Sequence, residues 1–250
     1  MPASQHTRRL VELSHVIESG RATYPGLPAP IVDAFMTHES SRAHYASGTE
    51  FHLGRIAMAA NTGTYIDAPF HRFPGGADIA DLPLEALVDL RCVVVRAGGS
   101  AADGPPRGRA AMATGGSQRS PGGGSASGRA IDAAVFDGLD IAGRAVLVDT
   151  GWSDRWGTPA YFEGHPFLTA AAAERLVAGG AALVGIDSLN IDDTDDPTRP
   201  VHSALLAAGI AIVEHMRGLN ELPDANARFF AAPVRVRGLG SFPVRAFAIV

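Results

Sequence analysis

The sequence is short of cysteine and of clustered positive charge, and both shortages limit what the protein can do. Its one cysteine, Cys92, cannot form a disulfide within the chain, which favours a reducing, cytoplasmic location. Cys92 precedes three valines, and cysteine is among the most buried residue types, so we expect a strand residue in the core and not a nucleophile. The formal net charge is −5, and no run of Lys or Arg is longer than Arg8-Arg9. This distribution argues against a nucleic-acid groove and favours a small-molecule ligand.

Signals for membranes, phosphate loops and serine nucleophiles are also missing. The first ten residues, MPASQHTRRL, lack the apolar core of a signal peptide, and no apolar stretch approaches the thickness of a bilayer. No Gly-Lys-Ser/Thr triplet follows a glycine cluster, as it would in a phosphate-binding loop. Ser125 lacks the second glycine of a Gly-x-Ser-x-Gly elbow. We therefore expect no membrane partner and no serine hydrolase chemistry.

What remains is typical of one globular enzyme-sized domain. The chain has 250 residues, of which 46% are hydrophobic and 19% charged, enough for a single core spanning residues 1–250. Residues 98–129 differ, because they are rich in Gly, Ser and Pro and nearly free of large apolar side chains. Such a segment buries too little surface to offset its ordering entropy, so it is predicted to be a flexible surface insertion.

Short apolar runs predict strands, and capping patterns predict three helices. Thr169 is a suitable N-cap for one helix, and Gly179-Gly180 would end it. The expected strands are Leu10–Val16, Ile31–Phe35, Phe51–Ala60, Cys92–Val95, Ala145–Thr150, Ala182–Asp187, Ile210–Glu214, Phe229–Val236 and Val244–Val250, and the expected helices are Leu82–Leu90, Ala170–Ala178 and Pro200–Ala208. This mixture predicts a layered α/β or α+β domain.

A histidine and a glutamate are the first candidates for chemistry. His202 lies in the first turn of a predicted helix, and Glu214 ends the strand that follows it. The helix climbs roughly 10 Å and the strand returns over a similar distance, so both side chains can finish at the same end of the domain. A histidine and a carboxylate that meet suit zinc or manganese. On spacing alone, however, a capping histidine and a solvated glutamate are the commoner interpretation.

The segment Asn61-Thr-Gly-Thr-Tyr-Ile-Asp-Ala-Pro-Phe-His71 adds to this pair. It resembles the signature His-x-Gly-Thr-His-x-Asp-x-Pro-x-His of the cyclase and bacterial kynurenine formamidase (arylformamidase) family of metal-dependent hydrolases. The resemblance covers nearly the whole chain except residues 98–129. Further landmarks occur in the family's order at Leu13-Ser-His15, Tyr24-Pro-Gly26, Thr150-Gly-Trp152, His165-Pro166, Gly185-Ile-Asp187, Pro200-Val-His202 and Ile212-Val-Glu214.

The resemblance implies roles for individual residues. In such enzymes the two leading histidines and the aspartate of the signature hold one metal, and the aspartate holds a second with a later histidine and glutamate. The last histidine of the signature acts in catalysis. Here Asp67, His71, His202 and Glu214 match this pattern. The two leading histidines are replaced by asparagine and tyrosine, at positions 61 and 65.

These two replacements change the expected metal content. An amide oxygen and a neutral phenol are much weaker zinc ligands than two imidazoles, so Asn61 and Tyr65 mark the remnant of a first site that is empty or weak. The resemblance leaves one divalent metal, zinc or manganese, on Asp67, His202 and Glu214, with room for a water. His71 would then act as general base.

Four more side chains are weaker candidates. Asp187 would support the site from behind or cap the end of its strand. Trp152 would line a pocket or pack in the core, and His165 would form pocket wall or lie on the surface. His52, in the strand before Asn61, is the nearby imidazole that would replace a lost ligand, although a lone histidine is usually not a ligand.

The acidic loop that follows is expected to be solvated. It has no glycine at the sixth position and no closing glutamate, so it is not a calcium-binding EF-hand. Clusters of charge of this kind are normally hydrated. The loop consists of Asp192, Asp193, Asp195 and Asp196.

Three functions remain open. The resemblance implies a metal-dependent hydrolase of an amide, formamide or lactam bond in a small, aromatic molecule, as in the kynurenine formamidases of tryptophan catabolism, on a swivelling β/β/α domain in a homodimer or homotetramer. The second is a metal-poor cyclase, isomerase or lyase in which His71 and Tyr65 transfer protons. The third is a non-catalytic small-molecule binding protein on the same scaffold.

Overall fold

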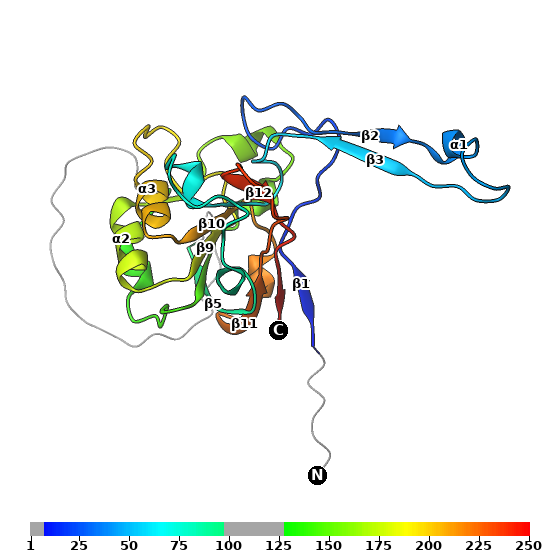
Figure 1. The fold of residues 1–250 in the computed structure, drawn as a ribbon. Coiled ribbons are helices and arrows are strands. Elements are labelled where there is room, and N and C mark those ends of the chain that lie inside the picture. The colour runs from blue at the N-terminus through cyan, green and yellow to red at the C-terminus, as the bar shows by residue number, and fades with distance from the viewer. Residues whose placement is uncertain (1–7, 98–127) are drawn as a thin grey trace, which may run out of the picture.

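One mixed, curled β-sheet of nine strands organises the molecule (Figure 1). The computed structural model describes residues 8–97 and 128–250. The strand order is β1-β13-β11-β5-β7-β9-β10-β4-β12. The strands are β1 (Leu10–Glu12), β4 (Tyr65–Asp67), β5 (Leu90–Arg96), β7 (Ala145–Asp149), β9 (Leu183–Ile186), β10 (Ala211–Glu214), β11 (Ala225–Phe230), β12 (Ser241–Pro243) and β13 (Phe247–Ile249).

The centre of the sheet is parallel and its two sides are antiparallel. Strands β5, β7, β9 and β10 run parallel to one another, β11 joins β5 antiparallel, and β4 joins β10 antiparallel. The parallel strands are continuous runs of apolar residues buried on both faces, as is usual for such strands. The predicted α/β class, with a mixed sheet and few helices, is confirmed.

Two helices cover one face of the sheet, α2 (Ala170–Ala178) and α3 (Pro200–Ala207), which pack against each other (Figure 1). Alternate residues of the central strands point to this helical face, and the remaining ones point to a second core on the other face. The predicted start of α2 is confirmed, because the Thr169 side chain accepts a hydrogen bond from the Ala172 amide. The helix ends at Gly179, as expected.

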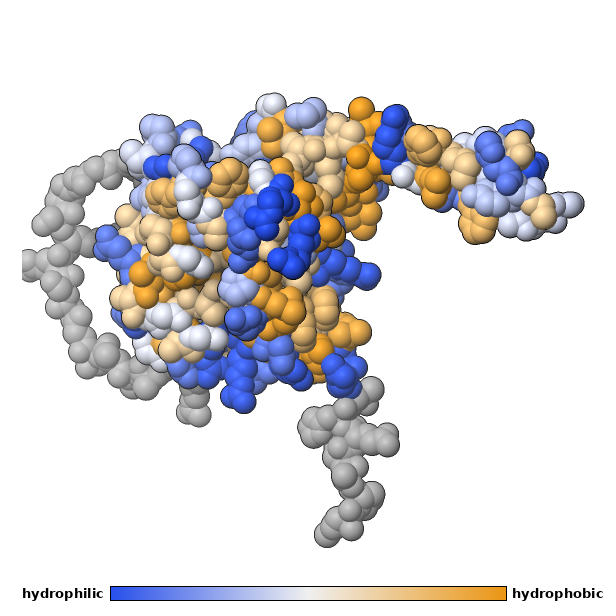
Figure 2. Space-filling view, in the orientation of Figure 1, coloured by the Kyte–Doolittle hydropathy of each residue, from blue (hydrophilic) through white to orange (hydrophobic). Residues whose placement is uncertain are grey.

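A two-stranded arm projects from the body (Figure 1). It pairs β2 (Ile31–Met36) antiparallel with β3 (Leu53–Ala57), and the short helix α1 (His38–Ser41) lies at its tip. Every residue of β3 is exposed, and hydrophobic side chains are visible along the arm (Figure 2). A smaller parallel pair joins β6 (Ala130–Ile131) to β8 (Phe167–Leu168).

Three predicted elements differ from the structure. The expected helix Leu82–Leu90 is wrong: only a single 3-10 turn forms at Leu84–Ala86, and Asp89 adopts a left-handed conformation (φ 60°) that starts β5. The loop expected around position 65 contains β4. The strand expected at Val244–Val250 is shortened to β13, and β12 forms just before it, where no strand was expected.

The predicted insertion at residues 98–129 lies outside the described residues, except for its last two positions. Among the helices that the structure does describe, none is both long and apolar enough to cross a membrane.

Candidate active site

Strand pairing brings the signature next to the later ligands. Strand β4 lies between β10 and β12, with Tyr65 opposite Glu214 and Asp67 opposite Ser241. Directly paired residues in antiparallel strands have neighbouring side chains, so the register alone joins these two pairs. The Tyr65 hydroxyl donates a hydrogen bond of 2.5 Å to Glu214 Oε2.

A single 3-10 turn, η1 (Pro69–His71), folds the end of the signature back over β4. Proline sits at its first position, where the missing N–H is not needed. The turn brings His71 Nδ1 to 3.7 Å from Asp67 Oδ1. Gly240 makes room for it, because a Cβ at this position would be 2.5 Å from the backbone nitrogen and Cα of His71.

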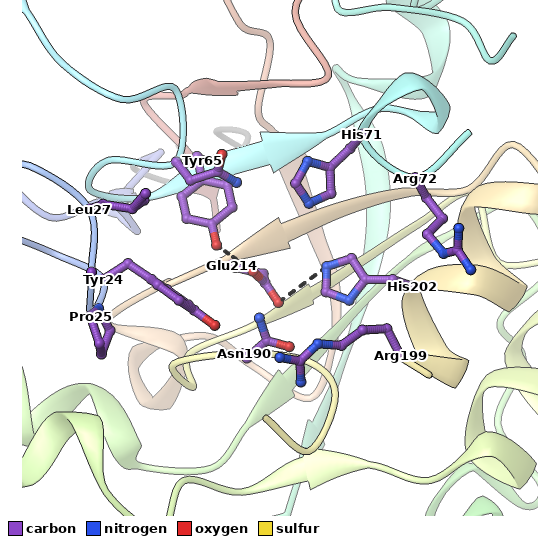
Figure 3. A pocket seen from close by; sticks show the side chains of 12 residues that line it. Tyr24, Pro25, Leu27, Tyr65, His71, Arg72, Asn190, Arg199, His202 and Glu214 are labelled. Atoms are coloured by element: carbon purple, nitrogen blue, oxygen red, sulfur yellow. Dashed lines mark hydrogen bonds and ion pairs between the residues drawn. The ribbon is translucent and has the colours of Figure 1, made fainter. Parts of the chain in front are cut away.

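His202 is held in place by Asp192. One Asp192 oxygen accepts the Val201 amide (2.7 Å), and the other accepts both the His202 amide (3.0 Å) and His202 Nδ1 (2.7 Å). The ring is thereby turned so that Nε2 lies 3.6 Å from Asp67 Oδ2 and 3.8 Å from Glu214 Oε1. The predicted meeting of His202 and Glu214 at one end of the domain therefore occurs in the structure (Figure 3).

The expectation of a solvated acidic loop is wrong for Asp192, which is fully buried. Asp195 is exposed, as expected. Asp192 lies ten residues before His202, too far for a local capping pattern, so no sequence signal distinguishes it from its acidic neighbours. Carboxylates that hold the second nitrogen of a ligand histidine are common in metal sites.

Ser241 joins the signature residues, and the sequence did not single it out. Its hydroxyl donates to Asp67 Oδ1 and lies 2.9 Å from His71 Nδ1. A serine has one proton, so with that proton on Asp67 the oxygen accepts from His71 and from the Asn61 amide (3.1 Å). A neutral His71 consequently carries its free lone pair on Nε2.

The electrostatics of this cluster depend on burial. Burial alone lowers the pKa of His202, but its contacts with Asp192 and Asp67 and the charge of Glu214 outweigh it and raise the pKa to about 10. Burial raises the pKa of Glu214 to about 7, assisted by the charge of Asp67 and opposed by His202. Burial likewise raises the pKa of Tyr65 well above its usual value, so the phenol keeps its proton.

Asp67 is the side chain of the cluster whose pKa is lowered, so its carboxyl group is ionised. Burial pushes its pKa upward, but its contacts with His202, His71 and Ser241 outweigh burial and hold the pKa below the usual value. One of its oxygens, Oδ2, is buried without a hydrogen-bond partner. An ionised carboxylate with a buried, unpaired oxygen requires a neighbouring positive charge.

The residues present fit one divalent cation. Ligand atoms of Asp67, His71 and His202 all lie within 4.8 Å of one another, and the unpaired Asp67 Oδ2 lies 3.6 Å from His202 Nε2. A cation here would replace the proton that His202 otherwise carries. Glu214 is less free than expected, because its oxygens accept from Tyr65 and from the Ile191 amide (2.6 Å).

The two replaced signature positions act as hydrogen-bond donors. The Asn61 amide donates to Ser241, and the Tyr65 hydroxyl donates to Glu214. A neutral amide and a protonated phenol are weak ligands for a divalent cation, even where their lone pairs are free. That the first metal position is empty or weak stays a prediction.

A pocket of about 380 Å³ opens over the cluster (Figure 3). Tyr65 and Glu214 point into it from the sheet, His71 from η1 and His202 from α3 (Figure 3). The Tyr24-Pro25-Gly26 turn, a predicted landmark, forms the opposite wall. The other lining residues are Leu27, Asn61, Arg72, Asn190 and Arg199.

His165 and Asp187 support the site from a distance. His165 is buried, and its Nε2 lies 3.1 Å from the Asp192 carbonyl oxygen, so it steadies the loop that orients His202. Asp187 accepts the Thr150 amide and hydroxyl (2.8 and 2.6 Å), which ties the ends of β7 and β9 together. This contact corresponds to the strand-end alternative for Asp187.

Trp152 and His52 lie outside the pocket lining. The Trp152 indole donates to the Tyr161 carbonyl (2.9 Å) and packs in an apolar cluster with Leu189. His52 lies on the arm, exposed and facing His38, with 5.8 Å between the ring centroids. Within one chain it is therefore not a substitute for the lost signature histidines.

Comparison with known proteins places the chain among related enzymes. The profile of a family described as "Putative cyclase" matches residues 11–193. The kynurenine formamidase of Bacillus cytotoxicus is 26% identical, with 94% of this chain and 95% of the relative covered. That of Paracidovorax citrulli is 27% identical, with 96% and 95% covered.

Solved structures have the same fold. A potential metal-dependent hydrolase with cyclase activity is 25% identical, with a TM-score of 0.70 over 97% of this chain and 98% of that one. Isatin hydrolase A from Labrenzia aggregata, bound to benzyl benzoate, is 20% identical, with a TM-score of 0.71 over 97% and 94%.

Proposed function

Because this chain belongs to the cyclase family, we propose that it is a metal-dependent hydrolase of an amide, formamide or lactam bond in a small aromatic molecule. The related kynurenine formamidases and the metal-dependent hydrolase of similar structure support this assignment. The observation that carries it is the group formed by Asp67, His71 and His202, of which His71 and His202 line a pocket sized for a small molecule and Asp67 is buried beside them. The scaffold is the swivelling β/β/α domain of such enzymes.

Asp67, His71 and His202 would hold the cation, with zinc and manganese as the candidates because both accept imidazole and carboxylate ligands. When bound, such a cation supplies Lewis-acid polarisation of a carbonyl and a more acidic water. Glu214 is the third ligand expected from the sequence, and His71 takes its place in this set. Glu214 is the poorer candidate because both of its oxygens already accept hydrogen bonds.

The protein's own side chains divide the remaining tasks. Asp192 keeps the Nδ1 proton of His202, so that Nε2 presents its lone pair to the centre of the site. Glu214, with its pKa raised to about 7 by burial, is suited to take up and return a proton near neutral pH. The phenol of Tyr65 keeps its proton, faces the same pocket and donates to Glu214 at rest. Once Glu214 has taken up a proton, the phenol is suited to donate its own proton to a developing oxyanion instead.

Metal analysis of the purified protein tests this function. We expect about one divalent ion per chain, because one ligand group survives. His202→Ala and His71→Ala should each remove the ion, whereas Glu214→Gln should retain it. Two tightly bound ions per chain, or none after metal addition, would contradict the proposal. Loss of the ion in Glu214→Gln but not in His71→Ala would restore the original ligand set.

A metal-poor cyclase, isomerase or lyase is the second candidate. The short hydrogen bond between Tyr65 and Glu214 favours it, since it joins a proton donor to a carboxylate with a pKa of about 7 in the pocket. Full turnover after chelation, with His71 and Tyr65 still required, would support this reading. Binding of aromatic amides without any turnover would instead indicate a non-catalytic binding protein.

A further inference from the structure

Two arginines line the pocket beside the proposed ligands (Figure 3). Arg72 follows His71 directly at the end of η1, and Arg199 precedes α3, three residues before His202. Neither belongs to the proposed metal ligands or to the groups that move protons. Their place next to the reacting centre makes them candidates for binding another part of the substrate.

Each guanidinium is anchored through one nitrogen and keeps the others available. Arg72 Nε donates to Ser203 Oγ (3.1 Å), and Arg199 Nη1 donates to the Asp193 carbonyl (2.5 Å). Over residues 8–97 and 128–250, no carboxylate lies within 4.0 Å of either group. Arg55 and Arg96, by contrast, each pair with an aspartate at 2.6 Å.

The backbone around Arg199 adds to its role. This residue has a left-handed conformation (φ 48°, ψ 61°), which only a few per cent of non-glycine residues adopt. It caps α3 without a side-chain hydrogen bond to the helix, so its side chain is directed to the pocket instead (Figure 3). Arg199 is half-buried, and partial burial strengthens its interaction with an anion.

The floor of the pocket would repel an anionic group. Asp67, Asp192 and Glu214 are buried carboxyl groups in or directly behind it. These carboxyl groups offset the charge of a cation at the floor, so the two arginines are the stronger attraction for an anionic part of the substrate. A planar carboxylate matches a guanidinium, because two parallel N–H groups can meet its two oxygens.

The opposite wall suits a flat ring. Tyr24 and Leu27 face the pocket across from the arginines (Figure 3). A volume of about 380 Å³ fits one aromatic ring with two short substituents. One substituent would then reach the proposed ligands and the other the two guanidinium groups.

We propose that Arg72 and Arg199 determine the specificity of this pocket by binding a carboxylate of the aromatic substrate. This inference rests on the proposed function and narrows its substrate. Both arginines are substrate-binding residues in this scheme.

Two matched substrates test it. 2-Formamidobenzoate and 2-formamidobenzamide share the scissile formamide and differ in a charged carboxylate against a neutral carboxamide. The parent enzyme should prefer the benzoate in kcat/KM by about 10- to 100-fold, the ratio expected for hydrogen bonds to charged groups. Arg72→Gln and Arg199→Gln should each lose most of this preference through KM, and leave the benzamide within about twofold.

Charge-conserving and surface variants control for folding. Arg199→Lys should retain part of the preference, since lysine keeps the charge but not the planar fork. Arg91→Gln, an exposed arginine on β5, should behave as the parent. Equal losses on both substrates in the glutamine variants, or no preference in the parent enzyme, would overturn the inference.

Binding of non-hydrolysable benzoate and benzamide, measured by calorimetry, separates this inference from the proposed function. Arginine-dependent binding of benzoate without formamide hydrolysis would refute the hydrolase and support the carboxylate site. Hydrolysis of both substrates without arginine dependence would support the hydrolase and refute the carboxylate site. Arginine-dependent binding of inorganic phosphate but not benzoate would overturn the carboxylate assignment in favour of a phosphate ester.

Discussion

Tyr65 stands where the family signature has a histidine, and it acts as a hydrogen-bond donor there. The phenol occupies the place of a signature imidazole, stays protonated and donates to Glu214. Burial of such a large polar side chain is costly unless its hydroxyl is satisfied, and Glu214 satisfies it. The pair therefore replaces a ligand by a proton donor next to a carboxylate.

Tyr65→Phe isolates that hydroxyl, because it keeps the ring and deletes one oxygen. If the hydroxyl stabilises an oxyanion, kcat should fall by about 10²–10³. Metal content should stay at the parental value, because Tyr65 is not in the ligand group. Steady-state kinetics together with elemental analysis check both statements. Turnover at the parental rate would show that the hydroxyl has no catalytic task.

The raised pKa of Asp187 predicts that the stability of the protein depends on pH. Burial raises its pKa to about 6, above the value of about 3.8 in an unfolded chain. A raised carboxyl pKa means that the folded state binds the proton more tightly. Stability is therefore greatest below about pH 3.8 and falls as the pH rises through 6, by about 2–3 kcal/mol for this residue.

Asp187→Asn should remove this contribution. The free energy of unfolding of the variant minus that of the parent should increase as the pH rises from 4 to 8, measured by denaturant titration. Asp195→Asn, an exposed residue, is the control and should track the parent. A constant difference between Asp187→Asn and the parent across this range would contradict the pKa shift.

At this scale the sequence indicated the residues of the site but not the side chains that support them. Asp67 and His71 were identified from the signature and His202 from a later landmark, although the sequence-based ligand set had Glu214 where the structure groups His71. Asp192 and Ser241 were not, since they reach the site through a long-range cap and an edge strand. Their roles depend on tertiary contacts, which leave no local pattern in the sequence.

Among the secondary-structure elements, edge strand β12 has the most direct influence on the site. It brings Ser241 to Asp67 and places Gly240 against the backbone of His71. The approach is too close for any side chain at position 240. Correct placement of η1 therefore depends on this glycine.

Gly240→Ala should displace η1 and weaken the metal site. Overpacking of this kind typically costs 1–3 kcal/mol, so thermal stability should fall, and calorimetric metal affinity should fall with it. Gly75→Ala is a matched control, because a Cβ there meets nothing within 4 Å and the glycine has no positive φ. Parental metal affinity in Gly240→Ala would show that the neighbouring backbone adapts without loss.

Elements with strong local signals were predictable. The boundaries of α2 and the start of α3 follow from Thr169 and Pro200, and the buried parallel strands follow from their apolar runs. Strand β4 was not recognised, because glycine and proline flank its three residues. Its conformation is set by pairing with β10 and β12 on either side.

On the scale of the whole molecule, the two-stranded arm exposes apolar side chains that no other part of the same chain covers in the residues that the structure describes. Both of its strands expose large apolar side chains, and Phe35 is 75% exposed. An isolated two-stranded hairpin is marginally stable in water, so a long, apolar one requires a cover. The other exposed apolar residues of the arm are Ile31, Val32, Phe51, Leu53 and Ile56.

A second copy of the chain is the cover that we expect, in line with the homo-oligomer suggested by the sequence. In a two-fold symmetric dimer each arm would lie on the partner, so one set of side chains serves both contacts. Phe35→Glu combined with Ile56→Glu should then produce monomers in sedimentation velocity, because two buried charges oppose association. Val234→Glu is the control, since Val234 is also exposed but lies away from the arm, and it should remain oligomeric. A parent protein that sediments as a monomer at every concentration would contradict this assembly and leave the apolar arm to a different partner.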